Sequence, residues 1–336
     1  MAGPAPIQEI SIQDSAELSK CIAQADRPLV FRGLVSDWPL VVAAKTSMSA
    51  ARDYLLGFYD DAQVTAFVGD KEGAGRIFYS PGLEAFNFQP IKTSMDWVFE
   101  RLAALECEAE PETIYMGSAA IDACLPGLGE ENRLPVIPES ASVRIWIGNQ
   151  TTVAAHYDVT QNVACVCAGR RRFTLFPPEQ VENLYVGPLD FTPAGQSVSL
   201  VDLEAPDLDC FPRFAHALEH AQSAELLPGD GLFIPSMWWH HVQGLERFNV
   251  LVNHWWRDSA SYMGPPGDVL LHALLNLRDL PDAQRAAWRA HFEYYVFGPR
   301  NRAIEHLPPD RRGALGDLDG DMARRLRALL RNHLNR

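Results

Sequence analysis

One short motif in this sequence combines residue types that bind transition metals. His156, Tyr157 and Asp158 follow one another beside a segment that predicts a β-strand. Because alternate residues of a strand face the same side, His156 and Asp158 can both point toward one interior. An imidazole and a carboxylate are two of the three ligands in the 2-His-1-carboxylate group, which leaves Fe(II) open positions for a cosubstrate and O₂. Alone, H-x-D is equally compatible with a surface turn.

The pair His240-His241 is the best source of the missing histidine. It ends the segment 227–241, in which a Gly-Asp turn, an apolar strand and a proline precede the histidines. Adjacent residues of an extended chain face opposite sides, so only one of the two can be a ligand. The other histidines lie in an irregular region, in helical patterns or between Asn253 and two tryptophans: His216, His220, His254, His272, His291, His306 and His333.

These motifs together resemble the JmjC and cupin-like family of Fe(II)- and 2-oxoglutarate-dependent oxygenases, and within it most closely the asparaginyl hydroxylases. The resemblance covers roughly residues 26 to 298 and is much more specific than H-x-D alone. The matching residues are Pro28 to Pro39, His156 to Asp158, Gln161, Asn162, Phe176 to Gln180, Leu184, Tyr185, Gly229, Asp230, Ile234, Pro235, Trp238 to His241, Val252 and Asn253.

The resemblance implies a role for each matching residue of the site. The metal ligands are His156, Asp158 and His240, and His241 faces away. Arg171 occupies the position of the family's lysine, which binds the far carboxylate of 2-oxoglutarate. Arginine can do so with its planar fork of N–H donors.

Five further residues are implied as cofactor-binding or pocket residues: Tyr115, Thr152, Asn162, Asn253 and Trp255. Tyr115 can either offer its hydroxyl to the same carboxylate or serve only in packing. The two asparagines match inward polar positions near the metal. The family's threonine on this carboxylate aligns with Val153, and Thr152 is adjacent but out of phase. Trp255 matches a pocket wall, and the common alternative for a tryptophan is core packing.

The implied cofactors are Fe(II), 2-oxoglutarate as cosubstrate, and O₂. The implied reaction hydroxylates a protein or peptide side chain or a small molecule, with release of succinate and CO₂. Two alternatives stay open: a metal-dependent cupin enzyme that does not use 2-oxoglutarate, whose usual H-x-H motif is absent here, and a non-enzymatic cupin-like binding protein. A serine hydrolase has no support, because the sequence lacks G-x-S-x-G.

The elements around these motifs predict a mainly β protein with flanking helices, and the resemblance specifies a double-stranded β-helix (jelly-roll) core. Short β-rich runs separated by Gly and Pro turns favour a sandwich or barrel. We expect a mixed α/β part over 1–110, the core over 111–258 with an insertion at 187–225, and a helical region over 259–336. Strands are expected at 28–33, 63–68, 76–79, 113–116, 142–147, 162–167, 172–176, 231–235 and 248–256, and helices at 14–25, 47–56, 93–105, 268–277, 281–297 and 321–334.

Composition restricts the class of protein and its partners further. The chain has 336 residues, of which 47% are hydrophobic and 21% charged, so a globular protein with a sizeable core is expected. Its 29 Lys and Arg against 43 Asp and Glu give a net charge of −14, which makes nucleic acid an unlikely partner. No apolar run is long enough for a membrane span. Neither a secretory signal nor a disulfide pattern is visible, which predicts a cytoplasmic protein.

Partners are predicted less sharply than cofactors. The last helical patterns carry apolar stripes that either pack on the same chain or form a two-fold interface, and the resemblance favours a homodimer through the C-terminal helices. The prime substrate, and the choice between hydroxylation and demethylation, are left open by the sequence.

Overall fold

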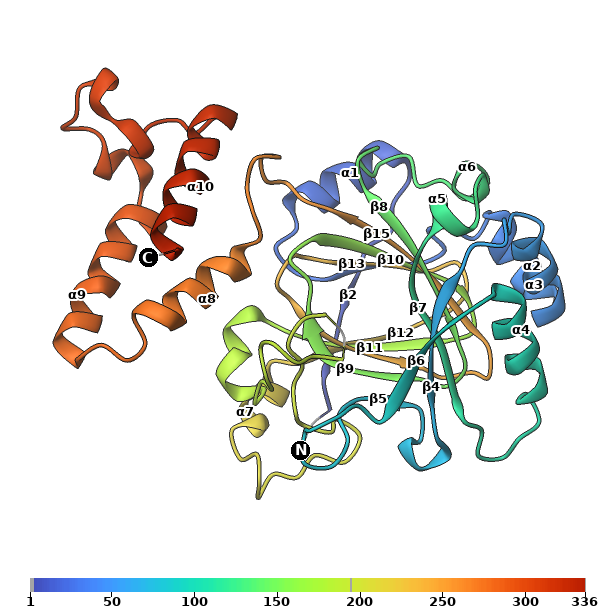
Figure 1. Ribbon diagram of the computed structural model, residues 1–336. Coiled ribbons are helices and arrows are strands. Elements are labelled where there is room, and N and C mark those ends of the chain that lie inside the picture. Colours follow the sequence, from blue (N-terminus) through green and yellow to red (C-terminus); the bar gives the residue numbers. More distant parts are fainter. Residues whose placement is uncertain (1–2, 194, 336) are drawn as a thin grey trace. The chain divides into compact units, whose positions relative to one another are not determined.

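A computed structural model describes residues 3–193 and 195–335 (Figure 1). The chain divides into two compact units, Met1–Arg257 and Asp258–Arg336. All the strands among the described residues lie in the first unit, and the described residues of the second form helices and turns. The predicted mainly β fold with flanking helices is therefore confirmed.

Within the described residues, the strands form two sheets. The six-stranded sheet has the order β1 (Ala5–Pro6), β12 (Gln222–Leu226), β11 (Arg171–Phe176), β14 (Trp239–Gly244), β9 (Thr152–Tyr157) and β5 (Arg76–Ile77). The nine-stranded sheet has the order β2 (Gln8–Glu9), β3 (Leu29–Phe31), β13 (Gly231–Ile234), β10 (Gln161–Ala168), β15 (Asn249–Trp256), β8 (Ser142–Gly148), β7 (Thr113–Ala120), β4 (Val64–Gly69) and β6 (Phe88–Thr93).

The two sheets face each other across an apolar layer. Phe173 and Leu175 from the six-stranded sheet pack in one cluster with Val166 and Leu232 from the nine-stranded sheet. On β10 the alternate residues, such as Cys165, belong to a second cluster on the other side of the strand. Since β10 is buried on both faces, its sequence is a continuous apolar run rather than an alternating one.

Helices of the first unit cover the outer side of the nine-stranded sheet (Figure 1). They are α1 (Ser15–Gln24), α2 (Pro39–Thr46), α3 (Met48–Leu56), α4 (Met95–Ala104), α5 (Ile121–Cys124) and α6 (Leu128–Glu131). In α4, Ser94 caps the first turn by accepting a hydrogen bond from the backbone N–H of Trp97, and Met95, Val98 and Leu102 are buried. Residues spaced in this way lie on one face of a helix, which explains why the sequence pattern predicted it.

The strands that the sequence analysis did not specify are the two-residue strands β1 and β2, and β6, β9, β12 and β14. β9 and β14 hold the histidines of the metal motif, so polar residues interrupt their apolar pattern. β6 contains Pro90 and lies at the edge of the nine-stranded sheet, where a missing N–H is tolerated. β12 lies between β1 and β11, so residues from 222 onward belong to the sheet rather than to the irregular segment that begins at 187.

That irregular segment runs along β9 before it forms the short helix α7 (Phe214–Glu219). Val198 forms an isolated bridge with His156, and the Ser199 backbone N–H donates to the Ala155 carbonyl at 2.7 Å. The segment thereby reaches the strand that carries the histidine of the H-x-D motif.

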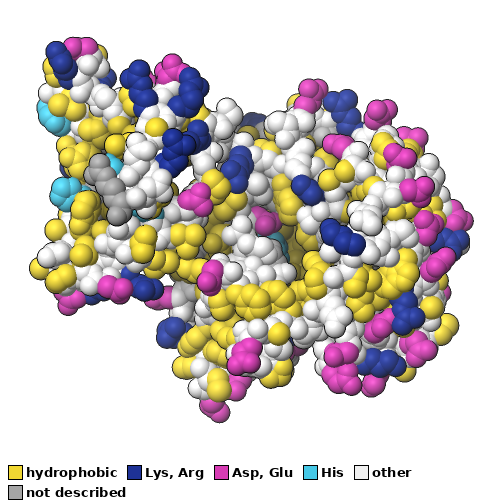
Figure 2. Space-filling model, viewed as in Figure 1, with side chains coloured by type: hydrophobic (Ala, Val, Ile, Leu, Met, Phe, Trp, Pro, Cys, Tyr) yellow, Lys and Arg dark blue, Asp and Glu magenta, His cyan; other side chains and the backbone are white. Residues whose placement is uncertain are grey.

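The described part of the second unit contains α8 (Pro266–Asn276), α9 (Asp282–Phe292), a π-helical turn (Glu293–Phe297), three 3₁₀-helical turns (Arg300–Ala303, Pro309–Arg311 and Gly313–Leu315) and α10 (Gly320–Leu334). Asp319 caps α10 by accepting from the Met322 backbone N–H at 2.8 Å. Many apolar side chains of this unit are exposed, including Leu275 at 75% and Phe297 at 73% (Figure 2). None of the helices in the described part of the chain is long and apolar enough to cross a membrane.

Burial of His254 predicts a pH-dependent stability. Its side chain on β15 packs beside Trp38, and burial lowers its pKa from 6.5 to about 4. In the unfolded chain His254 therefore binds a proton below about pH 6.5, whereas in the native state it binds one only below about pH 4. The free energy of unfolding consequently falls as the pH drops from 6.5 to 4.

Replacing His254→Gln should reduce that loss by about 1.4 kcal/mol per pH unit, the value of one proton. Urea unfolding of the metal-free protein at several pH values between 4 and 6.5 measures the slope. Measurements above pH 7.5 serve as the control, because there the two proteins should differ by a constant amount. An unchanged slope in the variant would contradict the assignment.

Candidate metal and 2-oxoglutarate site

The ligand atoms of His156, Asp158 and His240 lie within 4.8 Å of one another. His156 on β9 is paired directly with His240 on β14, and their ring centroids are 4.3 Å apart. Asp158 follows the end of β9, and its Oδ2 lies 3.6 Å from the Nε2 of His240. Two imidazoles and one carboxyl group on one side of a space form the facial donor set that suits Fe(II).

Backbone carbonyls orient both imidazoles. The Nδ1 of His156 donates to the Ala154 carbonyl at 2.9 Å, and the Nδ1 of His240 donates to the Trp238 carbonyl at 3.0 Å. A carbonyl can only accept, so each Nδ1 carries a proton, and in the neutral ring the Nε2 keeps a lone pair for a metal. The two rings are thus set in the tautomer that a metal requires.

Burial also keeps His240 in its metal-binding form. Burial, assisted by the neighbouring His156, lowers the pKa of His240 to about 4, although Asp158 acts in the opposite direction. The ring is therefore neutral at physiological pH. Its neighbour His241 is buried on the other face of β14, where it pairs in register with Thr174 of β11.

A strained loop connects the third ligand to the first two. The Met237 backbone N–H donates to the Asp158 carbonyl at 2.8 Å, and the Ser236 N–H donates to the Gln161 side-chain oxygen at 3.0 Å. Met237 has a φ of 69°, a left-handed conformation that disfavours a residue with a Cβ. These bonds hold the entry to β14 against the turn that carries Asp158.

Arg171 on β11 is the buried cation of the site. Its side chain is 1% exposed, and its Nε and Nη2 have no hydrogen-bond partner among residues 3–193 and 195–335. Its guanidinium interacts with the Tyr115 hydroxyl, while burial lowers the pKa of Arg171 and raises that of Tyr115. A buried guanidinium with unpaired donors is suited to a carboxylate, because two parallel N–H···O bonds then satisfy it.

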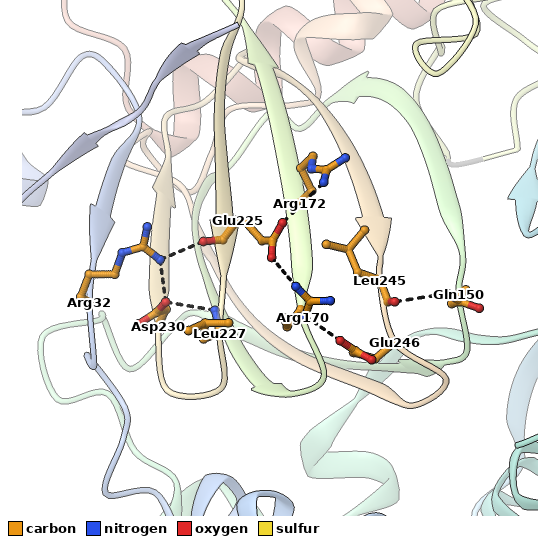
Figure 3. A network of polar contacts seen from close by, with 9 residues as sticks. All are labelled: Arg32, Gln150, Arg170, Arg172, Glu225, Leu227, Asp230, Leu245 and Glu246. Atoms are coloured by element: carbon orange, nitrogen blue, oxygen red, sulfur yellow. Dashed lines mark hydrogen bonds and ion pairs between the residues drawn. The ribbon is translucent and has the colours of Figure 1, made fainter. Parts of the chain in front are cut away.

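The two arginines beside Arg171 point to the outer face of the sheet. Figure 3 shows Arg170 between Glu225 and Glu246, with Arg172 also directed at Glu225. Arg32 and Asp230 form a further ion pair near the same turns. Outer carboxylates therefore satisfy the flanking cations, and only Arg171 of this triplet is directed at the barrel interior.

A cavity of 270 Å³ joins the metal group to Arg171. Its lining residues include the ligands and most of the cofactor-binding candidates: His156, Asp158, His240, Arg171, Tyr115, Asn162, Asn253 and Trp255. Asn253 donates its amide to the Asn162 side-chain oxygen at 2.8 Å, so these two residues fix each other's orientation. The cavity thus places a cation at one part of its wall and the metal group at another.

Thr152 does not line this cavity in the described structure, whereas Val153 does. A bulge in β9 explains the difference. His240 pairs with His156 and Val242 pairs with Val153, so β9 has one residue more than β14 between these pairs. The extra residue reverses the alternation and turns Val153 to the same side as His156. Thr152 instead pairs with Gln243.

A second bulge, in β7, contributes residues to the wall of the cavity. Met116 pairs with Ile147 and Ala119 with Ile145, which leaves Gly117 and Ser118 in the bulge. Both line the cavity, and Ser118 has a φ of 51°. A Cβ on Gly117 would come within 3.1 Å of the Phe67 ring, so glycine allows the aromatic wall to close at this point.

Trp146 is a lining residue that the sequence analysis missed. It lies on β8, where Ile145 and Ile147 belong to the outer core cluster and Trp146 faces the barrel interior. The sequence did contain a signal for this position: Trp146 lies between Ile145 and Ile147 on a predicted strand, so its side chain must face the side opposite to theirs. Its ring stacks on Tyr115 at 5.8 Å and meets Trp255 edge-on at 6.0 Å.

Fold and site together define a double-stranded β-helix protein with a His–Asp–His metal group. A model of the cupin-like domain family matches residues 15–262, and the chain belongs to that family. The family assignment and the metal group bear out the predicted cofactors, Fe(II) with 2-oxoglutarate and O₂.

Three relatives illustrate the similarity. The chain is 34% identical over 120 residues to "Lysine-specific demethylase JMJ31" of Arabidopsis thaliana, covering 35% of this chain and 21% of the relative. It is 36% identical over 174 residues to "tRNA wybutosine-synthesizing protein 5" of Danio rerio, covering 46% and 48%. It is 28% identical over 238 residues to "Lysine-specific demethylase 8" of Danio rerio, covering 68% and 53%. The matches thus span about a fifth to about a half of these relatives.

The two adjacent histidines should differ sharply in metal binding. His240→Ala should lower the affinity for Fe(II) by more than roughly 100-fold, because even groups that only orient a ligand are worth about 10- to 100-fold. His241→Gln, on the outer face, is the matched control and should bind one metal ion per chain like the wild type. Anaerobic equilibrium dialysis with metal analysis measures both, and loss of metal in the His241 variant alone would refute the assignment.

Proposed function

We propose that this protein is an Fe(II)- and 2-oxoglutarate-dependent hydroxylase of a protein or peptide side chain or of a small molecule. One observation carries the proposal: a buried guanidinium with unpaired donors lines the same cavity as a His–Asp–His group. Bound together, the metal, 2-oxoglutarate and O₂ supply an oxidation that releases succinate and CO₂ and hydroxylates a substrate C–H bond.

The residues of the chain provide geometry and a dry interior for this chemistry. His156, Asp158 and His240 would hold the metal from one side and leave the opposite side open. Arg171 and the Tyr115 hydroxyl would bind the far carboxylate of 2-oxoglutarate. The apolar side chains around them, such as Val153, exclude water and so strengthen these charged contacts.

The choice of reaction and substrate rests on the names of the relatives and on the charge of the chain. Two of the relatives are named as lysine-specific demethylases, and hydroxylation of an N-methyl carbon is the first step of such a demethylation. A third is named for tRNA modification, whereas the net charge of −14 opposes binding to a polyanion. A protein or small-molecule substrate is therefore the proposal, and tRNA is the second candidate.

We further propose a homodimer formed through the C-terminal helices. Apolar side chains on α8 and α10 are unusually exposed, among them Val269 at 60%, Leu330 at 49% and Leu334 at 59%. In water, an exposed apolar surface of this kind marks a site at which another protein surface binds. We also infer a cytoplasmic location, which the six unpaired cysteines support because thiols persist in a reducing compartment.

Arg171 should control 2-oxoglutarate binding without affecting the metal. In an anaerobic titration of the Fe(II)-loaded protein, 2-oxoglutarate should produce the visible charge-transfer band of a chelated keto acid. Arg171→Gln should weaken this binding roughly 10- to 100-fold, because a charge-assisted pair is lost, and Arg172→Gln on the same strand should not change it. Absence of the band in iron-loaded wild type would favour a cupin enzyme of another kind.

The dimer has its own test. Replacing both Leu330 and Leu334 with Glu should convert a dimer into a monomer in sedimentation equilibrium, because the new charges cannot be buried at an interface. Val181→Glu, at an equally exposed position of the first unit, should leave the mass unchanged. A dimer that survives the double substitution, or a chain lacking residues after 300 that still dimerises, would exclude α10 from the interface.

A further inference from the structure

Arg144 on β8 is an arginine of the barrel interior that the proposed function does not use. Its neighbours Ile145 and Ile147 belong to the outer core cluster, so Arg144 and Trp146 face the interior. Arg144 is paired in register with Asn253, which lines the cavity. The half-buried side chain of Arg144 therefore lies in the wall that also carries Trp146 and Asn253.

Arg144 lies toward the metal end of this wall rather than toward Arg171. Tyr115, which interacts with Arg171, pairs with the last residue of β8. Arg144 is four residues earlier, or about 13 Å away along the strand. Its partner Asn253 donates to Asn162, which follows shortly after the H-x-D motif. The two interior arginines are thus separated along the cavity.

The hydrogen bonds of Arg144 all go to neutral acceptors. Its Nε donates to the Ser142 hydroxyl at 2.9 Å, and its Nη1 donates to the Ser118 carbonyl at 3.2 Å. Among residues 3–193 and 195–335, its Nη2 has no partner and no carboxylate forms an ion pair with it. Other arginines of the first unit do pair with a carboxylate, among them Arg32, Arg76, Arg101, Arg170 and Arg172.

The bond to Ser118 does not by itself require a positive charge. Ser118 lies in the β7 bulge with a φ of 51°, and a donor that holds its carbonyl stabilises this conformation. An uncharged amide side chain, such as that of glutamine, could supply the same N–H. A half-buried cation without a counter-ion costs desolvation energy, so the charge of Arg144 calls for a second role.

The charges at the metal end favour an anion next to Arg144. Among the described lining residues the only carboxylate is Asp158, which belongs to the metal group. With Fe(II) and 2-oxoglutarate bound, the charges of the metal and Arg171 are balanced by those of Asp158 and of the two cosubstrate carboxylates. The charge of Arg144 then remains unbalanced beside a cavity of low dielectric, where an ion pair is stronger than in water.

We infer that Arg144 anchors the prime substrate by binding an oxyanion, a carboxylate or phosphate group located away from the carbon that is hydroxylated. The inference rests on the proposed function, because it concerns the substrate of the same site. A guanidinium binds both kinds of oxyanion through charge-assisted hydrogen bonds. Arg144 is thus a specificity-determining residue that favours an anionic substrate and disfavours one that brings a cation to the metal end.

NMR of the arginine side chains tests the inference. Protein labelled with ¹⁵N in arginine is loaded with Zn(II), as a diamagnetic substitute for iron, and saturated with 2-oxoglutarate. The Nε–H of Arg144 is bonded to Ser142, which slows its exchange with water, and Arg144→Lys identifies its resonance by removing it. The probes are benzoate and phenyl phosphate, whose rings can pack on aromatic side chains of the cavity such as Trp146, and benzamide is the neutral control.

At least one of the two anions should shift the Arg144 resonance saturably. Benzamide should bind roughly 10-fold more weakly, the value of one charge-assisted hydrogen bond. In calorimetric titrations Arg144→Gln, which can still donate to Ser118, should abolish this preference for the anion, and Arg144→Lys should retain most of it. Arg172→Gln removes the same charge from the outer face and should change nothing. The tighter of the two anions identifies the group as a carboxylate or a phosphate.

Four results would overturn the inference: equal binding of benzamide and benzoate, a preference for the anion that survives Arg144→Gln, no binding of either anion at millimolar concentration, or a shift of the Arg144 resonance by 2-oxoglutarate with no effect of the probes. Failure of the proposed function is recognised separately. If 2-oxoglutarate does not bind to the Zn(II)-loaded protein, the proposed function fails, while the same probes still report on Arg144 in its absence.

Discussion

The register between β9 and β14 is the constraint on which the rest of the site depends. It places His156 directly opposite His240, and the backbone carbonyl two residues before each histidine orients its ring. A shift by one residue would turn one imidazole to the outer face, because side chains alternate along a strand. The strained loop at Met237 and its hydrogen bond to the Asp158 backbone then bring the carboxylate to the same side. One strand pairing therefore assembles all three ligands.

Burial determines the charge state of His240 and the solvation of Arg171. The same burial that keeps His240 neutral also removes water from Arg171, whose Nε and Nη2 have no hydrogen-bond partner among the described residues. On the outer face of the sheet, Glu225 and Glu246 form ion pairs with Arg170. Adjacent arginines of β11 therefore differ: Arg170 is paired outside the barrel, and Arg171 lines the cavity inside it.

Much of the architecture was predictable because local patterns and tertiary packing agree. The spacing of Met95, Val98 and Leu102 predicted α4, and the continuous apolar run 162–167 predicted the doubly buried β10. β9 and β14 were not delimited, since polar side chains that serve the site break their alternation. β6 contains Pro90, which is acceptable only because the strand lies at an edge. Patterns therefore fail where function or position in the sheet overrides propensity.

The sequence by itself determined the donor types and the family resemblance, because these depend on residue identity. Strand alternation allowed only one of His240 and His241 as a ligand, and the resemblance implied His240. Only the tertiary structure decided which neighbours share the cavity. The bulge in β9 turns Val153 rather than Thr152 inward, and the bulge in β7 brings Gly117 and Ser118 to the wall. A bulge reverses the facing of every residue beyond it, and its position depends on pairing between strands that are distant in the sequence.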